Sequence, residues 1–568
     1  MAADIKIGCF LCRCYGEVSR VIDLDELQQE IIRFPWVAFC EIWDSLCLLE
    51  NIDELTQKIS ESGTDRILLA ACSPLARGDV ILHALERHGI NQASVELVDI
   101  REGCAWIHDN QPKEAMCKAR DLINMGLSAL KQREVSENQI IVPKREVLII
   151  GAGPAGMSAA VSLARLGFAV HVLDRARNPG GLLNLLKRIA PEDIGAEEDL
   201  HGLHKAFTNN ALVYYHPGAR LISSNGSVGD FAVEFKTGDN LHSVRVGAVI
   251  IASGARVMFA KGLYRYTELD GVVSGIELER RFLSGDVRAD NVVFIQCVGV
   301  RDVNSPYCST ICCPVSLKHA RQLKDLNPQA EITILHRDIM CPGNILEAYY
   351  RDTMQDGVKF VRFDLNNPPS IVGDERLEGV NVFESVTGIS RTIRADLVVL
   401  SSALVPHDDA ARIAEIFDLA LDPLGFYQVR TLMHPLETTR NGIFVCGSAR
   451  WPVLARTAIV QGEAVAMKAF ALLSQDSLAA SGMSQFRDRK IAHAIVDRDA
   501  CTGCGNCVAI CPYVACALEP ENGAFKSRVN IMRCTGCGSC VAVCPNGSIQ
   551  LPEQNARVIG AMLKNAFS

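Results

Sequence analysis

Apolar and polar positions along the centre of the chain follow a pattern that predicts an α/β fold. An apolar run at residues 147–150 precedes a glycine-rich turn, a segment of helical periodicity follows, and a second apolar run ends at Asp174. This order is typical of a strand, a tight turn, a helix and a second strand parallel to the first. Residues 145–181 therefore predict one unit of a doubly wound sheet.

The N-terminal part of the chain repeats this alternation on a smaller scale. Apolar runs at residues 5–10 and 67–71 alternate with segments of helical character at 24–33 and 79–88. The pattern predicts a small N-terminal α/β domain.

Three glycines define the central turn. Gly151, Gly153 and Gly156 form a G-x-G-x-x-G motif between the first strand and the helix. One such glycine makes the turn, one lets the backbone approach a pyrophosphate, and one lets the helix pack on the strand. Asp174 stands where a ribose-binding carboxylate is expected. The motif predicts a dinucleotide site, and the alternative is a glycine turn in a sheet without nucleotide.

Two later apolar strands end in small residues. Residues 249–254 are VIIASG and residues 442–449 are GIFVCGSA. Together with the glycine motif, they resemble the two-dinucleotide-domain flavoproteins of the thioredoxin reductase type, which implies FAD. Ser448 departs from that family, which carries an aspartate there. The expected cofactor contacts are Gly151, Gly153, Pro154, Ala155, Gly156, Asp174, Arg175, Gly181, Ser253, Gly254, Gly447 and Ser448.

Length, charge and composition narrow the class of protein. At about 150 residues per domain, a chain of 568 residues predicts three or four domains. A hydrophobic content of 48% with only 6% aromatic residues favours an α/β protein. The net charge of -9 argues against nucleic-acid binding. We expect a soluble, cytoplasmic protein without direct membrane insertion, because the first residues have no signal-peptide pattern and the apolar runs are short.

Cysteine is the exceptional residue of this composition. The chain has 23, of which eight lie between Cys9 and Cys117, four between Cys297 and Cys313, and nine between Cys501 and Cys544. In a large chain without a signal-peptide pattern, such groups indicate metal or redox sites rather than structural disulfides.

The middle group of cysteines interrupts a second dinucleotide-type unit. A strand is expected at residues 291–296, a helix follows, and a later strand at 331–336 matches the second strand of the unit, but the glycine turn is missing. Without that turn we expect no pyrophosphate site for NAD(P)H. The spacing allows an iron-sulfur cluster, a redox disulfide between Cys308 and Cys312, or zinc. Four cysteines stand in place of the turn: Cys297, Cys308, Cys312 and Cys313.

The N-terminal cysteines follow predicted strands. Cys12 and Cys14 come after the first apolar run, Cys72 after the second and Cys104 after a third. Strand ends at one edge of a parallel sheet converge in space. The thiolates can hold an iron-sulfur cluster, and buried apolar cysteines are the alternative.

The C-terminal cysteines form two copies of the bacterial ferredoxin run, each ending in Cys-Pro. Each run supplies three ligands to its own 4Fe-4S cluster and the fourth to the other. One predicted set is Cys501, Cys504, Cys507 and Cys544, and the other is Cys511, Cys534, Cys537 and Cys540.

The order of motifs from LCRC, AACSP and EGCAW through QCVGVRD and YCSTICC to GIFVCGSA closely resembles the A subunit of heterodisulfide reductase. The resemblance implies a 4Fe-4S cluster beside FAD, held by the four central cysteines. It implies that Lys318 approaches the flavin ring, and that Glu277 lies near it. It also implies an N-terminal cluster, for which we nominate Cys14, Cys47, Cys72 and Cys104, with Cys12 in reserve.

The partners that the resemblance further implies are the B and C subunits of such a system, ferredoxin and a hydrogenase-type small iron-sulfur subunit. The assembly would be a large hetero-oligomer that can be dimeric about this chain. In one respect the chain departs from the family, because the ferredoxin insert of its long members is missing and residues 182–296 contain no cysteine.

We therefore expect a thioredoxin-reductase-like flavoprotein of Rossmann type with an added N-terminal α/β domain and a C-terminal ferredoxin domain. Its function would be electron transfer, with electron pairs split or joined at FAD. The alternatives are a passive electron-transfer scaffold and an NAD(P)H-dependent disulfide reductase. The expected domains are 1–140, FAD-binding at 145–285 and 400–475, the second Rossmann-like domain at 286–399, and ferredoxin at 490–555.

Overall fold

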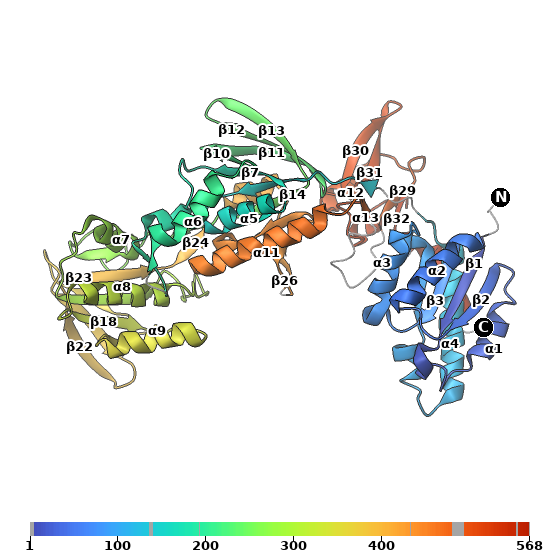
Figure 1. Cartoon of the computed structure of the whole chain (residues 1–568), viewed down its shortest axis with the longest axis horizontal. Coiled ribbons are helices and arrows are strands. Elements are labelled where there is room, and N and C mark those ends of the chain that lie inside the picture. Colours follow the sequence, from blue (N-terminus) through green and yellow to red (C-terminus); the bar gives the residue numbers. More distant parts are fainter. Residues whose placement is uncertain are drawn as a thin grey trace. The chain divides into compact units, whose positions relative to one another are not determined.

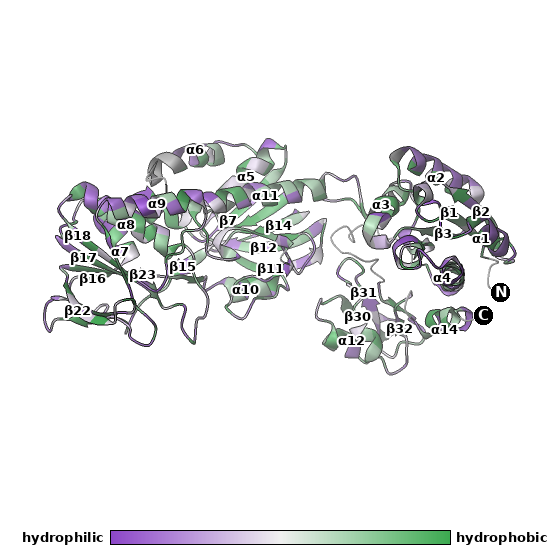
Figure 2. Cartoon of the chain, turned by 90° about the horizontal axis from the view of Figure 1, so that it is seen from below, coloured by the Kyte–Doolittle hydropathy of each residue, from purple (hydrophilic) through white to green (hydrophobic). Residues whose placement is uncertain are grey.

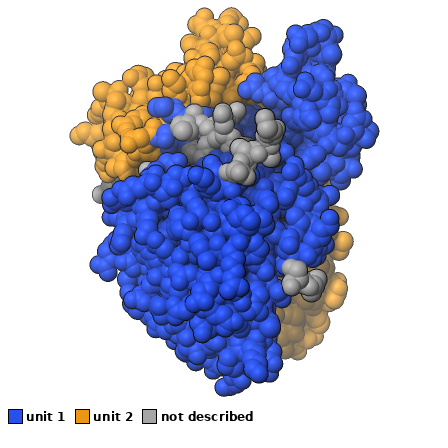
Figure 3. All heavy atoms as spheres, turned by 90° about the vertical axis from the view of Figure 1, so that its right-hand side faces the viewer, with its two compact units in different colours: residues 1–142, 477–568 blue, residues 143–476 orange. Residues whose placement is uncertain are grey.

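The computed structural model describes residues 5–135, 140–191, 194–431, 433–479, 493–552 and 555–566. The chain forms two compact units, Met1–Val142 with Ser477–Ser568, and Pro143–Asp476 (Figure 3). None of the helices in the described ranges is long and apolar enough to cross a membrane.

The larger unit contains a seven-stranded sheet in the order β10-β7-β6-β14-β27-β26-β25. The first five strands are parallel, and the last two are antiparallel to their neighbours. Helices α5 (Pro154–Arg165) and α11 (Ala455–Leu473) pack against each other beside this sheet (Figure 1). The strands are β6 (Glu146–Ile150), β7 (Ala169–Asp174), β10 (Val213–Pro217), β14 (Ala248–Ile251), β25 (Val429–Thr431), β26 (His434–Thr438) and β27 (Ile443–Val445).

Burial explains why these strands are nearly continuous apolar runs. All four residues of β14 are buried, because the strand lies inside the sheet with both faces covered. Figure 2 shows hydrophobic residues in β14 and β7. A three-stranded antiparallel sheet adds Phe231 and Phe235 to the same core. Its strands are β11 (Ala219–Ser227), β12 (Asp230–Thr237) and β13 (Asn240–Val246).

A second sheet in this unit has five parallel strands in the order β16-β23-β17-β18-β19. Helices α7 (Gly275–Ser284), α8 (Cys312–Leu326) and α9 (Asn344–Gln355) accompany it. The pattern of two Rossmann-type sheets confirms the predicted fold class. The strands are β16 (Val272–Ser274), β17 (Asn291–Val298), β18 (Glu331–His336), β19 (Lys359–Arg362) and β23 (Leu397–Ser402).

The smaller unit begins with a four-stranded parallel sheet in the order β2-β1-β3-β4. Its strands are β1 (Ile7–Cys12), β2 (Val37–Trp43), β3 (Arg66–Ala71) and β4 (Val95–Asp99). Its helices are α1 (Leu24–Ile31), α2 (Leu49–Ser62), α3 (Asp79–Arg87) and α4 (Pro112–Gln132).

The C-terminal part of the same unit has short elements around its cysteines. Helix α14 (Ala556–Asn565) packs against α4, and Nε of Arg557 donates to Oε1 of Gln132 over 2.7 Å. The elements that surround the cysteines are α12 (Asn506–Ile510), β30 (Cys516–Glu521), β31 (Ala524–Val529) and α13 (Ser539–Ala542).

Candidate functional site

One cavity of about 540 Å³ extends from the first glycine turn to the start of α8. Every expected FAD contact except Gly156 lines it. The far end is lined by residues of α7 and α8, including Glu279, Cys312, Lys318 and His319. The contacts of the near end are Gly151, Gly153, Pro154, Ala155, Asp174, Arg175, Gly181, Ser253, Gly254, Gly447 and Ser448.

The three glycines of the turn differ in what surrounds them. Gly151 has a φ of +107°, and an added Cβ would lie 2.3 Å from the carbonyl oxygen of Ala252. Among the described residues, no atom lies within 4 Å of a Cβ added at Gly153, which leaves its backbone open to the cavity. A Cβ at Gly156 would lie 1.9 Å from the carbonyl oxygen of Gly151, so this residue permits close helix packing. The turn fits the pyrophosphate of a dinucleotide.

Asp174 holds the two chain segments that frame this end of the cavity. Its Oδ2 accepts a hydrogen bond from the N–H of Ala152 over 2.6 Å, and its Oδ1 accepts from the N–H of Ala176 over 2.7 Å. The carboxylate therefore stabilises the glycine turn at the same time as it lines the cavity.

A buried charged network forms the far end. Nζ of Lys318 is ion-paired with Oε1 of Glu279, and both side chains are 1% exposed. Nζ of Lys318 also donates to the carbonyl oxygen of Arg188 over 3.0 Å. Nε2 of His319 lies 2.6 Å from Oε1 of Glu279, and Oε2 of Glu279 accepts from the N–H of Lys187 over 2.8 Å.

These partners determine the charge of the network. Burial alone would raise the pKa of Glu279, but the hydrogen bond and charge of His319, the charge of Lys318 and the N–H of Lys187 lower it to about 2. Burial and the neighbouring Lys318 lower the pKa of His319, although Glu279 opposes this. Glu279 is therefore ionised around neutral pH, and its carboxylate is ion-paired with Lys318 at the wall of the cavity.

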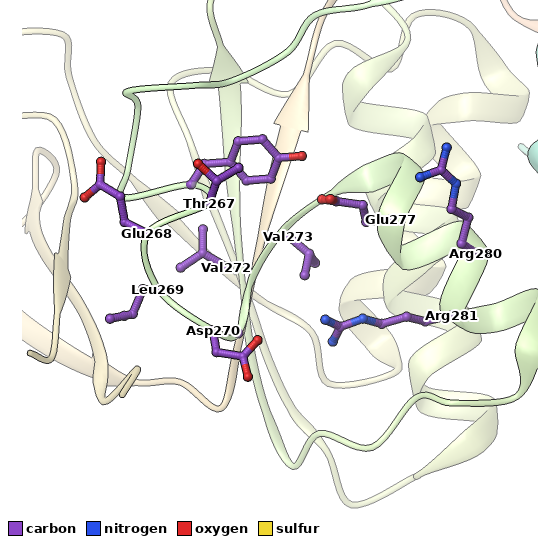
Figure 4. Close-up of a pocket in the computed structure, with 11 residues that line it drawn as sticks. Thr267, Glu268, Leu269, Asp270, Val272, Val273, Glu277, Arg280 and Arg281 are labelled. Atoms are coloured by element: carbon purple, nitrogen blue, oxygen red, sulfur yellow. The ribbon is translucent and has the colours of Figure 1, made fainter. Parts of the chain in front are cut away.

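The expectation that Glu277 serves the flavin site does not match the geometry. Its carboxylate accepts from the N–H and the Oγ of Ser274, over 2.7 and 2.8 Å, and forms the capping box of α7. It lines a separate pocket of about 410 Å³. Figure 4 shows it in this pocket with Arg280 and Arg281. Residues two apart on a helix face different sides, so Glu279 lines the larger cavity while Glu277 caps the helix.

The four central cysteines come together where β17 leads to α8. Cys297 has a φ of +62°, and the pairing of β17 with β23 is irregular between Ile295 and Val298. Cys312 begins α8, lines the large cavity and places its Sγ 3.6 Å from the carbonyl oxygen of Ser402. Sγ of Cys313 lies 3.8 Å from the carbonyl oxygen of Asp338.

The central cysteines lie close enough together for their charges to raise the pKa of Cys312 and Cys313. Burial raises the pKa of Cys313 to about 12, and the charges of Cys297 and Cys308 contribute, while the N–H of Met340 opposes the shift. Burial and the charges of Cys313, Cys297 and Cys308 raise the pKa of Cys312 still further. Burial and mutual repulsion thus favour the neutral thiols, and a cationic group such as iron would be needed to favour their deprotonated form.

In the N-terminal domain, the structure differs from the nominated ligands at one position. Sγ of Cys14 lies 3.4 Å from Sγ of Cys12, and a hydrogen bond to Cys14 lowers the pKa of Cys72. Cys47 packs on the same apolar cluster as Cys12 and Cys14. The thiol of Cys104 is fully buried and donates to the carbonyl oxygen of Ala115 over 3.1 Å. Geometry thus supports the reserve residue Cys12 in place of Cys104.

The C-terminal cysteines surround two small cavities. Each cavity is lined by three cysteines of one run and by the crossing cysteine of the other, as the ferredoxin pattern requires. Backbone N–H groups also point at the sulfurs, as from Ser527 to Cys501 over 3.4 Å. The first set is Cys501, Cys504, Cys507 and Cys544, and the second is Cys511, Cys534, Cys537 and Cys540.

One further thiol, which the sequence assigns to packing outside the ligand sets, lies at the second of these cavities. Cys516 lines it together with the four expected ligands and is buried. Throughout the described ranges, no three His, Cys, Asp or Glu side chains converge on one point as the ligands of a single ion would. The two C-terminal sets of cysteines instead surround cavities, an arrangement suited to clusters, whose ligands bind different iron atoms.

Comparisons with known proteins assign the flavin unit and the C-terminal cysteine region to two different families. Residues 145–462 match the family described as pyridine nucleotide-disulphide oxidoreductase, and residues 493–545 match the 4Fe-4S dicluster domain. These families imply FAD and 4Fe-4S clusters as cofactors. Among solved structures, thioredoxin reductase from T. acidophilum has a TM-score of 0.42 and 22% identity, covering 58% of this chain and 99% of its own.

Curated relatives match nearly the whole chain. The iron-sulfur A subunit of CoB–CoM heterodisulfide reductase from Methanocaldococcus jannaschii is 28% identical, with 96% of each chain covered. One of the two proteins of this name from Methanopyrus kandleri is 27% identical, over 92% of this chain and 91% of the relative. These matches confirm the resemblance to the A subunit of heterodisulfide reductase and the assignment as an oxidoreductase. Since its family match spans more than half of its length, the chain belongs to the pyridine nucleotide-disulphide oxidoreductases.

Proposed function

We propose that this chain is the flavin- and iron-sulfur-containing electron-transfer subunit of a heterodisulfide-reductase-like complex, in which electron pairs are split or joined at FAD. The observation that carries the proposal is the continuity of one cavity. Gly153 at the dinucleotide turn and Cys312 at the central cysteines line the same 540 Å³ space. A flavin held by the turn would therefore share its enclosure with the cysteine group.

The chemistry of the two cofactors supports a branching point. FAD, when bound, exchanges electron pairs as well as single electrons, whereas 4Fe-4S clusters pass single electrons. The chain would hold FAD through the glycine turn and the residues around it. It would hold one cluster through the central cysteines, two through the ferredoxin runs and a fourth through N-terminal cysteines.

The network of Lys318 supplies a proton and a positive charge to the cavity. Its ammonium group is buried beside the carboxylate of Glu279, whose pKa is lowered to about 2, so this carboxylate is ionised around neutral pH. A cation at the cavity wall stabilises negative charge on a bound ring and can donate a proton to it. We assign Lys318 this role, with Glu279 as the residue that positions it.

The proposed partners follow from the relatives. Several are named as the A subunit of CoB–CoM heterodisulfide reductase, and one from Methanosarcina acetivorans is named as ferredoxin/F(420)H(2)-dependent. We propose that this chain likewise works with B and C subunits, ferredoxin and a hydrogenase-type small iron-sulfur subunit. The terminal substrate would be handled by one of these partners.

Two other functions make different predictions. A passive electron-transfer scaffold would carry electrons without depending on a proton from Lys318. An NAD(P)H-dependent disulfide reductase would need a disulfide at Cys308 and Cys312, and NADPH alone would bleach its flavin. Bleaching by NADPH of the isolated chain would contradict the proposal.

The decisive experiment uses the complex copurified under anaerobic conditions, with iron counted per FAD. Ferredoxin reduction by the complex should fall by about 100-fold or more in Lys318→Ala, the range for loss of a general acid, with iron and FAD content unchanged. The matched control is Lys324→Ala, because Lys324 lies on the same helix and its ammonium group donates to the carbonyl oxygen of Pro328 at the surface. Equal rates in the two variants would favour the passive scaffold.

A further inference from the structure

An amide side chain beside the central cysteines has no partner for either of its polar atoms. Gln296 is 1% exposed, and neither its Oε1 nor its Nε2 has a hydrogen-bond partner among the described residues. Buried polar groups in folded proteins are almost always paired, and an unpaired one signals a missing ligand, water or functional role. A primary amide with two orphaned atoms therefore requires an explanation.

The position of Gln296 in the sheet shows which side it faces. Side chains alternate along a strand, so Gln296 shares a face of β17 with Val292 and Phe294. Both of those residues belong to the apolar core that contains Cys313 and Leu317 of α8. Gln296 thus lies on the face covered by α8, at the carboxyl end of the strand.

The strands on either side of β17 carry further polar residues level with Gln296. Ile295 pairs with Leu400 on β23 and with Leu335 on β18, which places Ser401 and His336 level with Gln296. Oγ of Ser401 lies 2.8 Å from Oγ of Ser316 on α8, so this residue is paired. Within the described part of the chain, Nδ1 of His336 has no partner, as for the amide of Gln296. Two side chains that have an unpaired polar atom among the described residues, Gln296 and His336, therefore lie level with each other at the carboxyl ends of these strands.

The chain changes direction directly after Gln296. Cys297 takes a φ of +62° where the ladder with β23 becomes irregular. The thiol of Cys297 packs on the same apolar cluster as Ile311, the residue directly before Cys312. Gln296 therefore stands next in the chain to one member of the cysteine group, and the sulfurs of an iron-sulfur cluster are acceptors for the N–H donors of an amide.

We propose that Gln296 is a hydrogen-bond donor to the cluster held by Cys297, Cys308, Cys312 and Cys313, and that it sets the reduction potential of this cluster. The inference rests on the proposed function, which puts a cluster there. Hydrogen bonds to cluster sulfurs are among the determinants of its potential. Reduction adds negative charge to the sulfurs, so a donor stabilises the reduced form and raises the potential.

The test compares two buried glutamines. Gln296→Met keeps the length of the side chain and removes the donor. The control is Gln322→Met, because Gln322 is also buried with an unpaired Oε1 among the described residues and lies on α8. It is ten residues beyond Cys312, about 15 Å along the helix axis. Redox titration of the full, cluster-loaded chain followed by EPR measures each midpoint potential.

The central signal is identified as the one lost when Cys312 and Cys313 are both replaced by alanine. In Gln296→Met its midpoint potential should shift downward, with iron content and the ferredoxin signals unchanged, and Gln322→Met should leave it in place. An unchanged potential in Gln296→Met would overturn the inference. Selective loss of the signal would give Gln296 a merely structural role and would also overturn it.

The failure of the proposed function has a different signature. If the double alanine variant retains every EPR signal and all of its iron, the central cysteines hold no cluster, and both proposals fall. If that signal is lost but Gln296→Met behaves as wild type, only the role of Gln296 fails.

Discussion

Two strand–loop–helix units of this chain have the same plan and different loops. In the first, β6 is joined to α5 by residues 151–153, a turn of small residues that brings the start of the helix to the cavity. In the second, β17 is joined to α8 by residues 299–311, and cysteines stand at both ends of the connection. Both loops lie at the carboxyl ends of parallel strands.

If the central cysteines hold the proposed cluster, one scaffold supports two kinds of cofactor. A pyrophosphate needs a short loop without side chains and the N-terminus of a helix. A cluster needs thiolates that approach from several directions, which a longer connection supplies. The sheet decides where a ligand binds, and the loop decides which ligand it is.

The largest effect should come from the cysteine loop. Replacing Cys312 and Cys313 by alanine removes two of the four proposed ligands, so about four iron atoms per chain should be lost. FAD should remain, because Cys312 lies at the other end of the cavity from the glycine turn. Iron analysis and the flavin absorption spectrum measure both. Full iron content in this variant would mean that the cysteine loop holds no cluster. The two loops would then not differ in the way that the comparison requires.

The converse change is Gly156→Ala in the glycine unit. The added Cβ would lie 1.9 Å from the carbonyl oxygen of Gly151, so the helix must shift away from the turn. We expect purified protein to contain little FAD while the ferredoxin EPR signals persist. The control is Gly202→Ala, because no described atom lies within 4 Å of a Cβ at Gly202. Full flavin content in Gly156→Ala would contradict a tight dinucleotide turn.

A smaller effect separates the two glutamates of α7. Glu279→Gln leaves the buried Lys318 without its counter-charge and should lower the free energy of unfolding of the flavin unit by about 3 kcal/mol. Glu277→Gln disturbs only a capping box and should cost about 1 kcal/mol. Denaturant unfolding followed by flavin fluorescence distinguishes them. Equal losses of unfolding free energy in the two variants would make Glu277 a candidate for the flavin site again.

The pH dependence of the stability lost in Glu279→Gln follows from the pKa of Glu279. The pKa of Glu279 is lowered to about 2 in the folded protein, so its stabilisation is complete above the unfolded pKa and fades only as the pH falls towards 2. The loss in Glu279→Gln should therefore be constant between pH 7 and 8.5. A loss that varied across this interval would mean that the carboxyl group titrates near neutrality.

The spacing of residues in the sequence was sufficient to predict a motif where the whole motif lies within one turn or loop. The glycine turn, the two ferredoxin runs and the replacement of the second turn by cysteines were all visible in the sequence, because each depends on neighbours a few residues apart. The choice between Glu277 and Glu279 was not, since both belong to one short helix and only its rotation against the sheet separates them.

The sequence by itself determined the fold class and the two cofactor types, and it predicted the pairing of ferredoxin ligands. Only the tertiary structure decided that Cys12 rather than Cys104 lies beside Cys14, and that the amide of Gln296 is buried without a partner among the described residues. The physical reason is the separation along the chain of the residues that determine each feature. Backbone conformation follows from adjacent residues, whereas the direction of a buried side chain depends on segments that are distant in the sequence and meet only after folding.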